Sequence, residues 1–202
     1  TPTELISLTA FYKYIKNPIS RIEVASAGGY LSYENIADHA TVAGTEIEVR
    51  KNIFTHSIGV NGDGANRLSL GLNTSYIYTN AKMPLATVTT GSQLEGAAPW
   101  IANFDLSYNY AKGDFSLVNT LILNYIGEKV YTIGTQGFQD IMENSLVTLD
   151  FVSQARLNKH VSLNLKARNL LNPAHKLVRK ANEGGDKVIL GNYKKGINIS
   201  LG

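Results

Sequence analysis

Apolar and polar residues alternate along residues 147–157 and again along residues 161–168, with only residues 158–160 between the two runs. A period of two residues is typical of a β-strand that has one apolar and one polar face. A polar connection of three residues is typical of a tight hairpin turn. The sequence therefore predicts a pair of neighbouring antiparallel strands in this part of the chain.

The same alternation predicts further strands at residues 4–16, 40–51, 67–82, 102–110, 115–133 and about 187–201. With the hairpin these make about eight strands, several of them roughly 10–16 residues long, whereas strands in globular proteins most often have about five or six. The connections between them alternate between long and short. We expect long loops at residues 17–39, 83–99, 134–144 and 174–187, and turn-rich or tight connections at residues 52–66, 111–114 and 158–160.

The medium on each side of these strands decides the fold class. Strands of about 9–11 residues or more, with long loops at one end and short turns at the other, are typical of a transmembrane β-barrel. Tyrosines near strand ends on the apolar face would form an aromatic girdle, and they are Tyr12, Tyr14, Tyr76, Tyr78, Tyr108 and Tyr110. A soluble sandwich or β-barrel would place the polar face in water but would not explain the strand lengths. The sequence therefore predicts an all-β fold, an antiparallel up-and-down transmembrane β-barrel wall of about eight long strands.

The composition agrees with a membrane wall. Charged residues make up 17% of the chain, against roughly 25% in typical soluble domains. The absence of cysteine excludes disulfides and thiolate metal sites. The net charge of +3 comes from basic residues dispersed along the chain, so nucleic-acid binding is not indicated. No run of about 18 apolar residues is present, so we expect no transmembrane helix.

The polar side of the predicted strands carries charged residues among Asn, Ser and Thr. Such charges would be costly in a packed core, whereas a hydrated or plugged lumen accommodates them. We therefore expect eight residues to face the lumen, namely Glu46, Glu48, Arg50, Asp105, Asp150, Arg156, Lys166 and Arg168. Glu46 and Glu48 beside Arg50 indicate a charge network that holds a plug rather than a pair of catalytic carboxylates.

The predicted loop after Pro173 is basic. It could attract an anionic ligand such as a ferric siderophore, an acidic glycan or lipopolysaccharide phosphate, or it could simply be solvated. The candidate residues are Lys176, Arg179, Lys180 and Lys187. The four histidines lie far apart in the sequence, so no metal site is predicted, and no catalytic nucleophile and base converge. We expect neither an enzyme nor a bound cofactor.

Five segments resemble the C-terminal barrel portion of TonB-dependent outer-membrane receptors, in the order that the family has them: Ser7–Ile19, Tyr33–Lys51, Leu94–Tyr110, Leu123–Asn144 and Val161–Pro173. The resemblance implies a barrel of about 22 strands closed around an N-terminal plug. It also implies a bacterial outer-membrane location and active uptake, through TonB, of a nutrient such as a ferric siderophore, cobalamin or an oligosaccharide. The expected partners are outer-membrane lipid, the rest of the barrel and its plug, TonB and a small nutrient ligand.

At roughly 25 residues per strand and connection, about eight strands make only part of such a barrel. We therefore expect residues 1–202 to be the C-terminal part of a receptor barrel, without the signal peptide, the plug and the TonB-contacting segment, and without the terminal aromatic residue that the family usually has. One alternative is a self-contained eight-stranded outer-membrane barrel, acting as an adhesin or anchor. The other is a soluble β-barrel binding protein.

Overall fold

The computed structural model describes residues 4–24, 30–58, 64–81, 93–135, 137–181 and 185–202. Within these residues all of the helix or strand structure is β-strand, which confirms the all-β prediction. The strands are β1 (Leu5–Lys16), β2 (Ile19–Glu23), β3 (Leu31–Asn35), β4 (His39–Ile58), β5 (Gly64–Ala81), β6 (Trp100–Lys112), β7 (Phe115–Ile126), β8 (Lys129–Thr132), β9 (Ile141–Glu143), β10 (Leu146–Arg156), β11 (Ser162–Arg168), β12 (Ala174–Lys180), β13 (Lys187–Lys194) and β14 (Asn198–Leu201).

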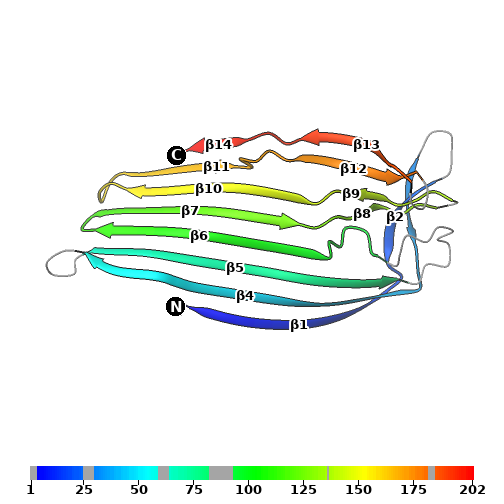
Figure 1. Ribbon diagram of the computed structural model, residues 1–202, viewed down its shortest axis with the longest axis horizontal. Helices are drawn as coiled ribbons and strands as arrows, with labels where there is room; N and C mark the ends of the chain where they lie inside the picture. The colour runs from blue at the N-terminus through cyan, green and yellow to red at the C-terminus, as the bar shows by residue number, and fades with distance from the viewer. Residues whose placement is uncertain (1–3, 25–29, 59–63, 82–92, 136, 182–184) are drawn as a thin grey trace.

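The long strands form one antiparallel wall (Figure 1). Eight of them make a sheet in the order β1-β4-β5-β6-β7-β10-β11-β14, and a second sheet in the order β13-β12-β9-β8 continues the last four strands at one end. Successive long strands are neighbours, which is the predicted up-and-down topology. β1 and β14 are opposite edges of the larger sheet, so the wall is open. A self-contained eight-stranded barrel would need those two edges to pair.

Each predicted long strand is present, but two of them are interrupted. The strand predicted at residues 115–133 is β7 followed by β8, and the last one is β13 followed by β14. The connection predicted at residues 52–66 is shorter than expected, because β4 and β5 continue into it until Ile58 pairs with Gly64. Its centre, residues 59–63, lies outside the described residues, as do residues 83–92 of the next predicted loop.

Three predicted long loops contain strands. The first contains the β2–β3 hairpin, the third contains β9, and the basic segment after Pro173 forms β12. These segments are strands because neighbouring segments supply their backbone hydrogen bonds. β12, for example, pairs with β9 on one side and with β13 on the other. The prediction that Lys176 to Lys187 form a loop is therefore wrong for residues 176–180, which belong to β12, and for Lys187, which begins β13.

The pairing register defines two faces of the wall, since directly paired residues point to the same side of a sheet. One row across the strands consists of Arg50, Gly71, Asp105, Ile122 and Asp150. The side to which this row points is the polar face. The neighbouring row points to the other side, the apolar face, and consists of Val49, Leu72, Phe104, Leu123 and Leu149.

Aromatic residues mark two levels on the apolar face. Tyr76 packs on Trp100 with ring centroids 4.7 Å apart, whereas Tyr110 lies near the opposite end of β6. The ten steps of the strand from Trp100 to Tyr110, at about 3.4 Å each, span about 34 Å along it. Strands in barrels are usually inclined by ~40° to the barrel axis, so the two levels lie about 26 Å apart along that axis. This height is close to the ~25 Å apolar band of outer-membrane barrels. The tyrosines predicted as a girdle thus divide between two levels, Tyr12, Tyr14, Tyr76 and Tyr78 at one and Tyr108 and Tyr110 at the other.

Buried apolar residues gather where the β2–β3 hairpin crosses one end of the wall (Figure 1). The cluster consists of Ile22, Ile36, Ala37, Ala40, Ala81, Leu94, Val130 and Ile133. Ala40 and Ala81 pair with each other and point to the polar face, so the hairpin covers that face. On the apolar face Leu8 is 73% exposed and Leu163 is 45% exposed. Such an exposed apolar surface requires another apolar phase to cover it.

Candidate functional site on the polar face

The polar face is hollowed over β4, β5 and β6. The hollow has a volume of ≈ 650 Å³, and charged or amide side chains from all three strands line it. The Glu48 carboxylate pairs with the Arg50 guanidinium at 2.8 Å. Asp105 lies over Gly71, where an added Cβ would stand 2.1 Å from the Asp105 Oδ1 atom. A glycine at position 71 therefore lets the carboxylate lie along the wall, and it keeps the hollow open.

All eight residues predicted to face the lumen are on this polar face. They are Glu46, Glu48 and Arg50 of β4, Asp105 of β6, Asp150 and Arg156 of β10, and Lys166 and Arg168 of β11. The structure does not bring them together as one cluster. Within the described residues the Glu48–Arg50 pair is the one ion pair among the eight. The predicted charge network is thus a face on which charges are dispersed.

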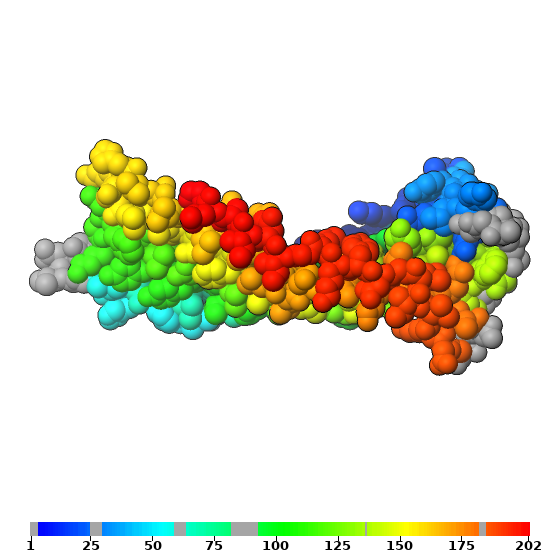
Figure 2. Space-filling view, turned by 90° about the horizontal axis from the view of Figure 1, so that it is seen from above, coloured from blue at the N-terminus to red at the C-terminus, as the bar shows by residue number. Residues whose placement is uncertain are grey.

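The β2–β3 hairpin stands over the polar face at the end with the long connections (Figure 2). β2 adds to the wall alongside the segment that follows β8. The Glu23 N–H donates to the Ile133 carbonyl at 3.2 Å, and the Ile133 N–H donates to the Arg21 carbonyl at 3.0 Å. These backbone bonds and the apolar cluster hold the hairpin across the polar face at this end of the wall. The sequence gives no clear sign of this element, because its two strands have only five residues each.

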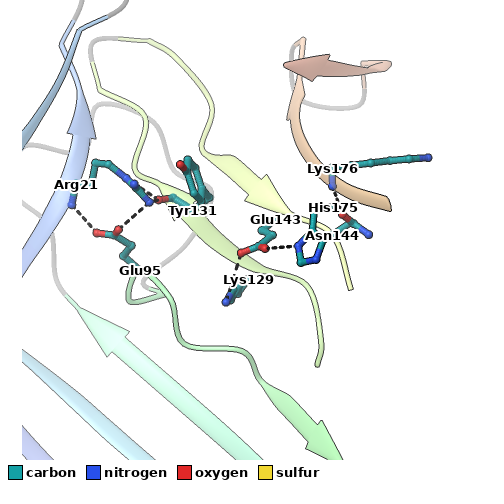
Figure 3. Close-up of polar contacts among 8 residues, drawn as sticks. All are labelled: Arg21, Glu95, Lys129, Tyr131, Glu143, Asn144, His175 and Lys176. Carbon is teal, nitrogen blue, oxygen red and sulfur yellow. Dashed lines mark hydrogen bonds and ion pairs between the residues drawn. The ribbon is translucent and has the colours of Figure 1, made fainter. Parts of the chain in front are cut away.

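Arg21 anchors one side of the hairpin (Figure 3). Its guanidinium lies 3.8 Å from the centre of the Tyr131 ring and donates to the Tyr131 carbonyl at 2.5 Å. The same group pairs with the Glu95 carboxylate at 3.1 Å, and both side chains are about four-fifths buried, being 18% and 22% exposed. Since burial strengthens a paired charge and penalises an unpaired one, the three groups depend on one another.

Arg179 anchors the other side. Its guanidinium pairs with the Glu23 carboxylate and lies 5.3 Å from the centre of the Phe138 ring. Burial lowers the pKa of Arg179 from its ordinary value, but a guanidinium starts so high that it stays charged at neutral pH. The pair joins residues 156 positions apart in the sequence. The hairpin therefore connects the early part of the chain with the last strands of the wall.

The basic residues predicted to bind an anion are in strands. Lys176, Arg179 and Lys180 belong to β12, and Lys187 begins β13. Two of them already face carboxylates of the chain, because Arg179 pairs with Glu23 and Lys187 lies 3.4 Å from Glu128. Lys180 and Lys187 border a hollow of ≈ 230 Å³ that also contains carboxylates. The charge available to an anionic ligand here is thus smaller than the sequence indicates.

A row of three interacting polar side chains, which the sequence did not predict, lies across β8, β9 and β12 (Figure 3). The Glu143 carboxylate lies 3.3 Å from the His175 Nδ1 atom and 3.4 Å from the Lys129 ammonium. His175 is 8% exposed, and its ring stacks on Tyr193 with centroids 4.9 Å apart. No sequence signal could have found this arrangement, because its members are brought together only by the pairing of β8 with β9 and of β9 with β12.

Two negative findings apply to the described residues. No group of three or more His, Asp or Glu side chains among them could hold a metal ion. None of the secondary structure described is a helix long and apolar enough to cross a membrane.

Comparison with known families identifies the chain. The model of the family described as "TonB dependent receptor-like, beta-barrel" matches residues 2–170, which include the whole wall from β1 through β11. Neither the curated proteins nor the solved structures contain a match. The family match agrees with the open antiparallel wall and its two faces. The chain therefore belongs to the TonB-dependent receptor-like β-barrel family, whose members are receptors of the bacterial outer membrane.

Proposed function

We propose that residues 1–202 are the C-terminal part of the barrel wall of an outer-membrane receptor that imports a nutrient with energy delivered through TonB. The apolar face contacts outer-membrane lipid, and the polar face lines a lumen that a plug occupies. The observation that carries this proposal is the register, which gathers eight charged residues on one side of the wall and exposed leucines on the other. The family match supports the same assignment.

The nutrient is a ferric siderophore, cobalamin or an oligosaccharide, the substrates that the resemblance implies. The lumen-facing charges Glu46, Glu48 and Arg50 contact the plug. At the outer end, the β2–β3 hairpin narrows the entrance, since it crosses the polar face where the connections are long. Long connections are extracellular in outer-membrane barrels, and loops carry recognition while strands supply the scaffold. The basic residues Lys176, Arg179, Lys180 and Lys187 then lie at the extracellular end.

Uptake measurements test the function. In the source bacterium, deletion of the gene for the intact protein is expected to abolish energy-dependent uptake of one of the three nutrient classes. An uncoupler that collapses the proton gradient is expected to have the same effect on the undeleted strain, because TonB draws on that gradient. Uptake of all three classes that is unchanged by the deletion would contradict the proposal.

Cysteine labelling tests the two faces, since the chain has no native cysteine. Asn103→Cys on the polar face is expected to react with a water-soluble maleimide roughly tenfold or more faster than Phe104→Cys on the apolar face, because an apolar environment raises the pKa of a thiol and lowers its thiolate fraction. When a spin label is attached to each cysteine in turn, a lipid-soluble nitroxide is expected to broaden the spectrum of the label at position 104 and not that of the label at position 103. The two residues are neighbours on β6, so each is the matched control for the other. Equal rates at both positions would contradict the assignment of the faces.

A further inference from the structure

Four neighbouring long strands are interrupted at one level of the wall. β7 gives way to β8 at residues 127–128, β9 to β10 at residues 144–145, β11 to β12 at residues 169–173 and β13 to β14 at residues 195–197. The last two interruptions contain left-handed backbone at Asn169 (φ 59°), Asn172 (φ 44°) and Gly196 (φ 83°). Asparagine and glycine are the residues that adopt left-handed backbone most readily, which suits them to the turns at these interruptions.

Side chains join the two turns to each other and to the polar face. The Asn169 side-chain amide donates to the Gly196 carbonyl at 2.6 Å, and the Gly196 N–H donates to the Asn172 side-chain oxygen at 3.0 Å. The Asn169 N–H donates to the Asp150 carboxylate at 2.7 Å. These bonds fix the position of the break between the eight-stranded sheet and the four-stranded sheet that continues it.

A hollow of ≈ 400 Å³ lies at this break, here called the junction hollow, and its polar lining includes Asn124, Thr148, Arg168, His175, Lys195 and Asn198. Its volume is within the range of small-molecule sites, which is about 300–1,000 Å³. Asn124 pairs with Thr148, and Arg168 pairs with Asn198, on the polar face of the sheet. In Figure 2 the outline of that face dips beside β13 and β14, which are red. The hollow is therefore open to whatever space the polar face lines.

The charge in the junction hollow favours an anion. Within the described part of the chain, neither Arg168 nor Lys195 has a carboxylate at ion-pair distance. The carboxylate of Asp150 also lines the hollow, but one of its oxygens accepts the Asn169 N–H. Two cations thus face one carboxylate that is already partly engaged. Arginine presents paired N–H donors that match the geometry of a carboxylate.

Beside the apolar side chains of Ile126 and Leu146, the remaining polar lining suits hydroxyl groups. Amide and hydroxyl side chains can both donate and accept hydrogen bonds, so Asn124, whose amide donates to the Thr148 hydroxyl at 3.2 Å, keeps its oxygen for a ligand, and Asn198 also lines the hollow. His175 is held in place, because its Nδ1 atom lies 3.3 Å from Glu143 and its ring stacks on Tyr193. Within the described residues the polar contact with Glu143 uses Nδ1, which leaves the hydrogen-bonding capacity of Nε2 for a ligand.

We propose that the junction hollow is a binding subsite for a small polyhydroxylated carboxylate, an acidic sugar of the uronate class. Its carboxylate pairs with Arg168 and Lys195, and its hydroxyl groups bond to Asn124, Asn198 and His175. The inference rests on the proposed function only for the statement that the hollow lies on the path of an imported solute. Binding itself does not depend on uptake or on TonB.

Calorimetric titration of the intact receptor in detergent micelles tests this site with galacturonate and galactose as probes. The two sugars differ only in that a carboxylate replaces a hydroxymethyl group. Galacturonate is expected to bind about tenfold or more tightly than galactose, and Arg168→Gln to weaken its binding by about tenfold, the loss of one charge-assisted contact. Arg168→Lys is expected to retain part of the affinity because it keeps the charge. Arg156→Gln is the matched control on the same hairpin, outside the hollow, and is expected to stay within about twofold of the wild type.

Three results would overturn the proposal: no detectable galacturonate binding, equal binding of both sugars, or an equal loss in Arg156→Gln and Arg168→Gln. Each variant is first shown to give the cysteine-labelling contrast between positions 103 and 104, so an unfolded variant is recognised. The labelling and the uptake measurements also distinguish a failure of the proposed function from a failure of the proposed binding site. Galacturonate binding without uptake of any nutrient would refute the proposed function and support the site.

Discussion

Replacing Leu121 with arginine is expected to destabilise the intact barrel by roughly 2–4 kcal/mol, the cost of a basic side chain at the bilayer midplane of a barrel. Leu121 is on the apolar face, opposite Leu106 on one side and Phe151 on the other. It is 40% exposed in the wall, so lipid would be its main environment. Leu121 pairs with Leu106, next to Asp105, which is midway along β6 between the aromatic levels at Trp100 and Tyr110. Leu121 is therefore near the middle of the apolar band.

The neighbouring position provides a control for this substitution. Ile122 is on the polar face between Asp105 and Asp150, so an arginine there would meet two carboxylates. We expect Ile122→Arg to change the folding free energy by less than about 1 kcal/mol, as for solvated ion pairs. Urea titration of folding into lipid vesicles measures both variants. A larger loss for Ile122→Arg than for Leu121→Arg would mean that the polar face, and not the apolar face, meets lipid.

Replacing Arg179 with methionine is expected to release the β2–β3 hairpin from the wall. The change keeps much of the side-chain volume but leaves the Glu23 carboxylate without its guanidinium in a place where it is only 15% exposed. Breaking a fully buried pair costs about 3–5 kcal/mol, and the partial exposure reduces this to roughly 2–3 kcal/mol. The loss is local, because the hairpin contacts the wall through few groups while the long strands keep their own pairing.

Hydrogen exchange measures this effect at amides whose bonds depend on the hairpin. The Glu23 N–H donates to Ile133, and the Ile36 N–H donates to the Pro18 carbonyl. Both are expected to exchange about 30-fold faster or more in Arg179→Met, the factor that corresponds to 2 kcal/mol. The double variant with Glu23→Gln is expected to recover part of the protection, because the stranded charge is then absent.

Lys187→Met is the control for the hairpin experiment. Its ion pair with Glu128 joins side chains that are 56% and 43% exposed, and exposed pairs contribute little to stability. We therefore expect no change in the exchange of the hairpin amides. Protection that is equal in Arg179→Met and the wild type would show that the apolar cluster around Ile22 holds the hairpin without the ion pair.

Local alternation along the chain predicted the wall correctly, because a strand exposed to two media carries its two environments in its own sequence. Leu149 and Asp150 are neighbours whose side chains differ in the medium that each prefers, and the register places them on opposite faces as expected. The same reasoning predicted the polar face that carries Arg50, Asp105 and Arg168. It also extended to the aromatic levels, since Tyr108 and Tyr110 follow the apolar register of β6.

The segment after Pro173 shows where this reasoning fails. Its lysines and arginine make residues 174–180 resemble a solvated loop, yet they form β12 because β9 and β13 offer backbone partners on both sides. The β2–β3 hairpin fails for a related reason. Its strands have five residues each, too few to give a clear period, and its anchors at Glu95, Tyr131 and Arg179 are remote in the sequence.

The sequence by itself determined that this protein is a two-faced antiparallel wall and which residues each face carries, because that information is local and repeats every two residues. Only the tertiary structure decided that the wall is open, that a hairpin covers one end of its polar face, and that four strands break at one level to form the junction hollow. These features depend on contacts between residues far apart in the chain, such as Glu23 with Arg179 and Asn169 with Gly196. A periodic pattern carries no record of such contacts.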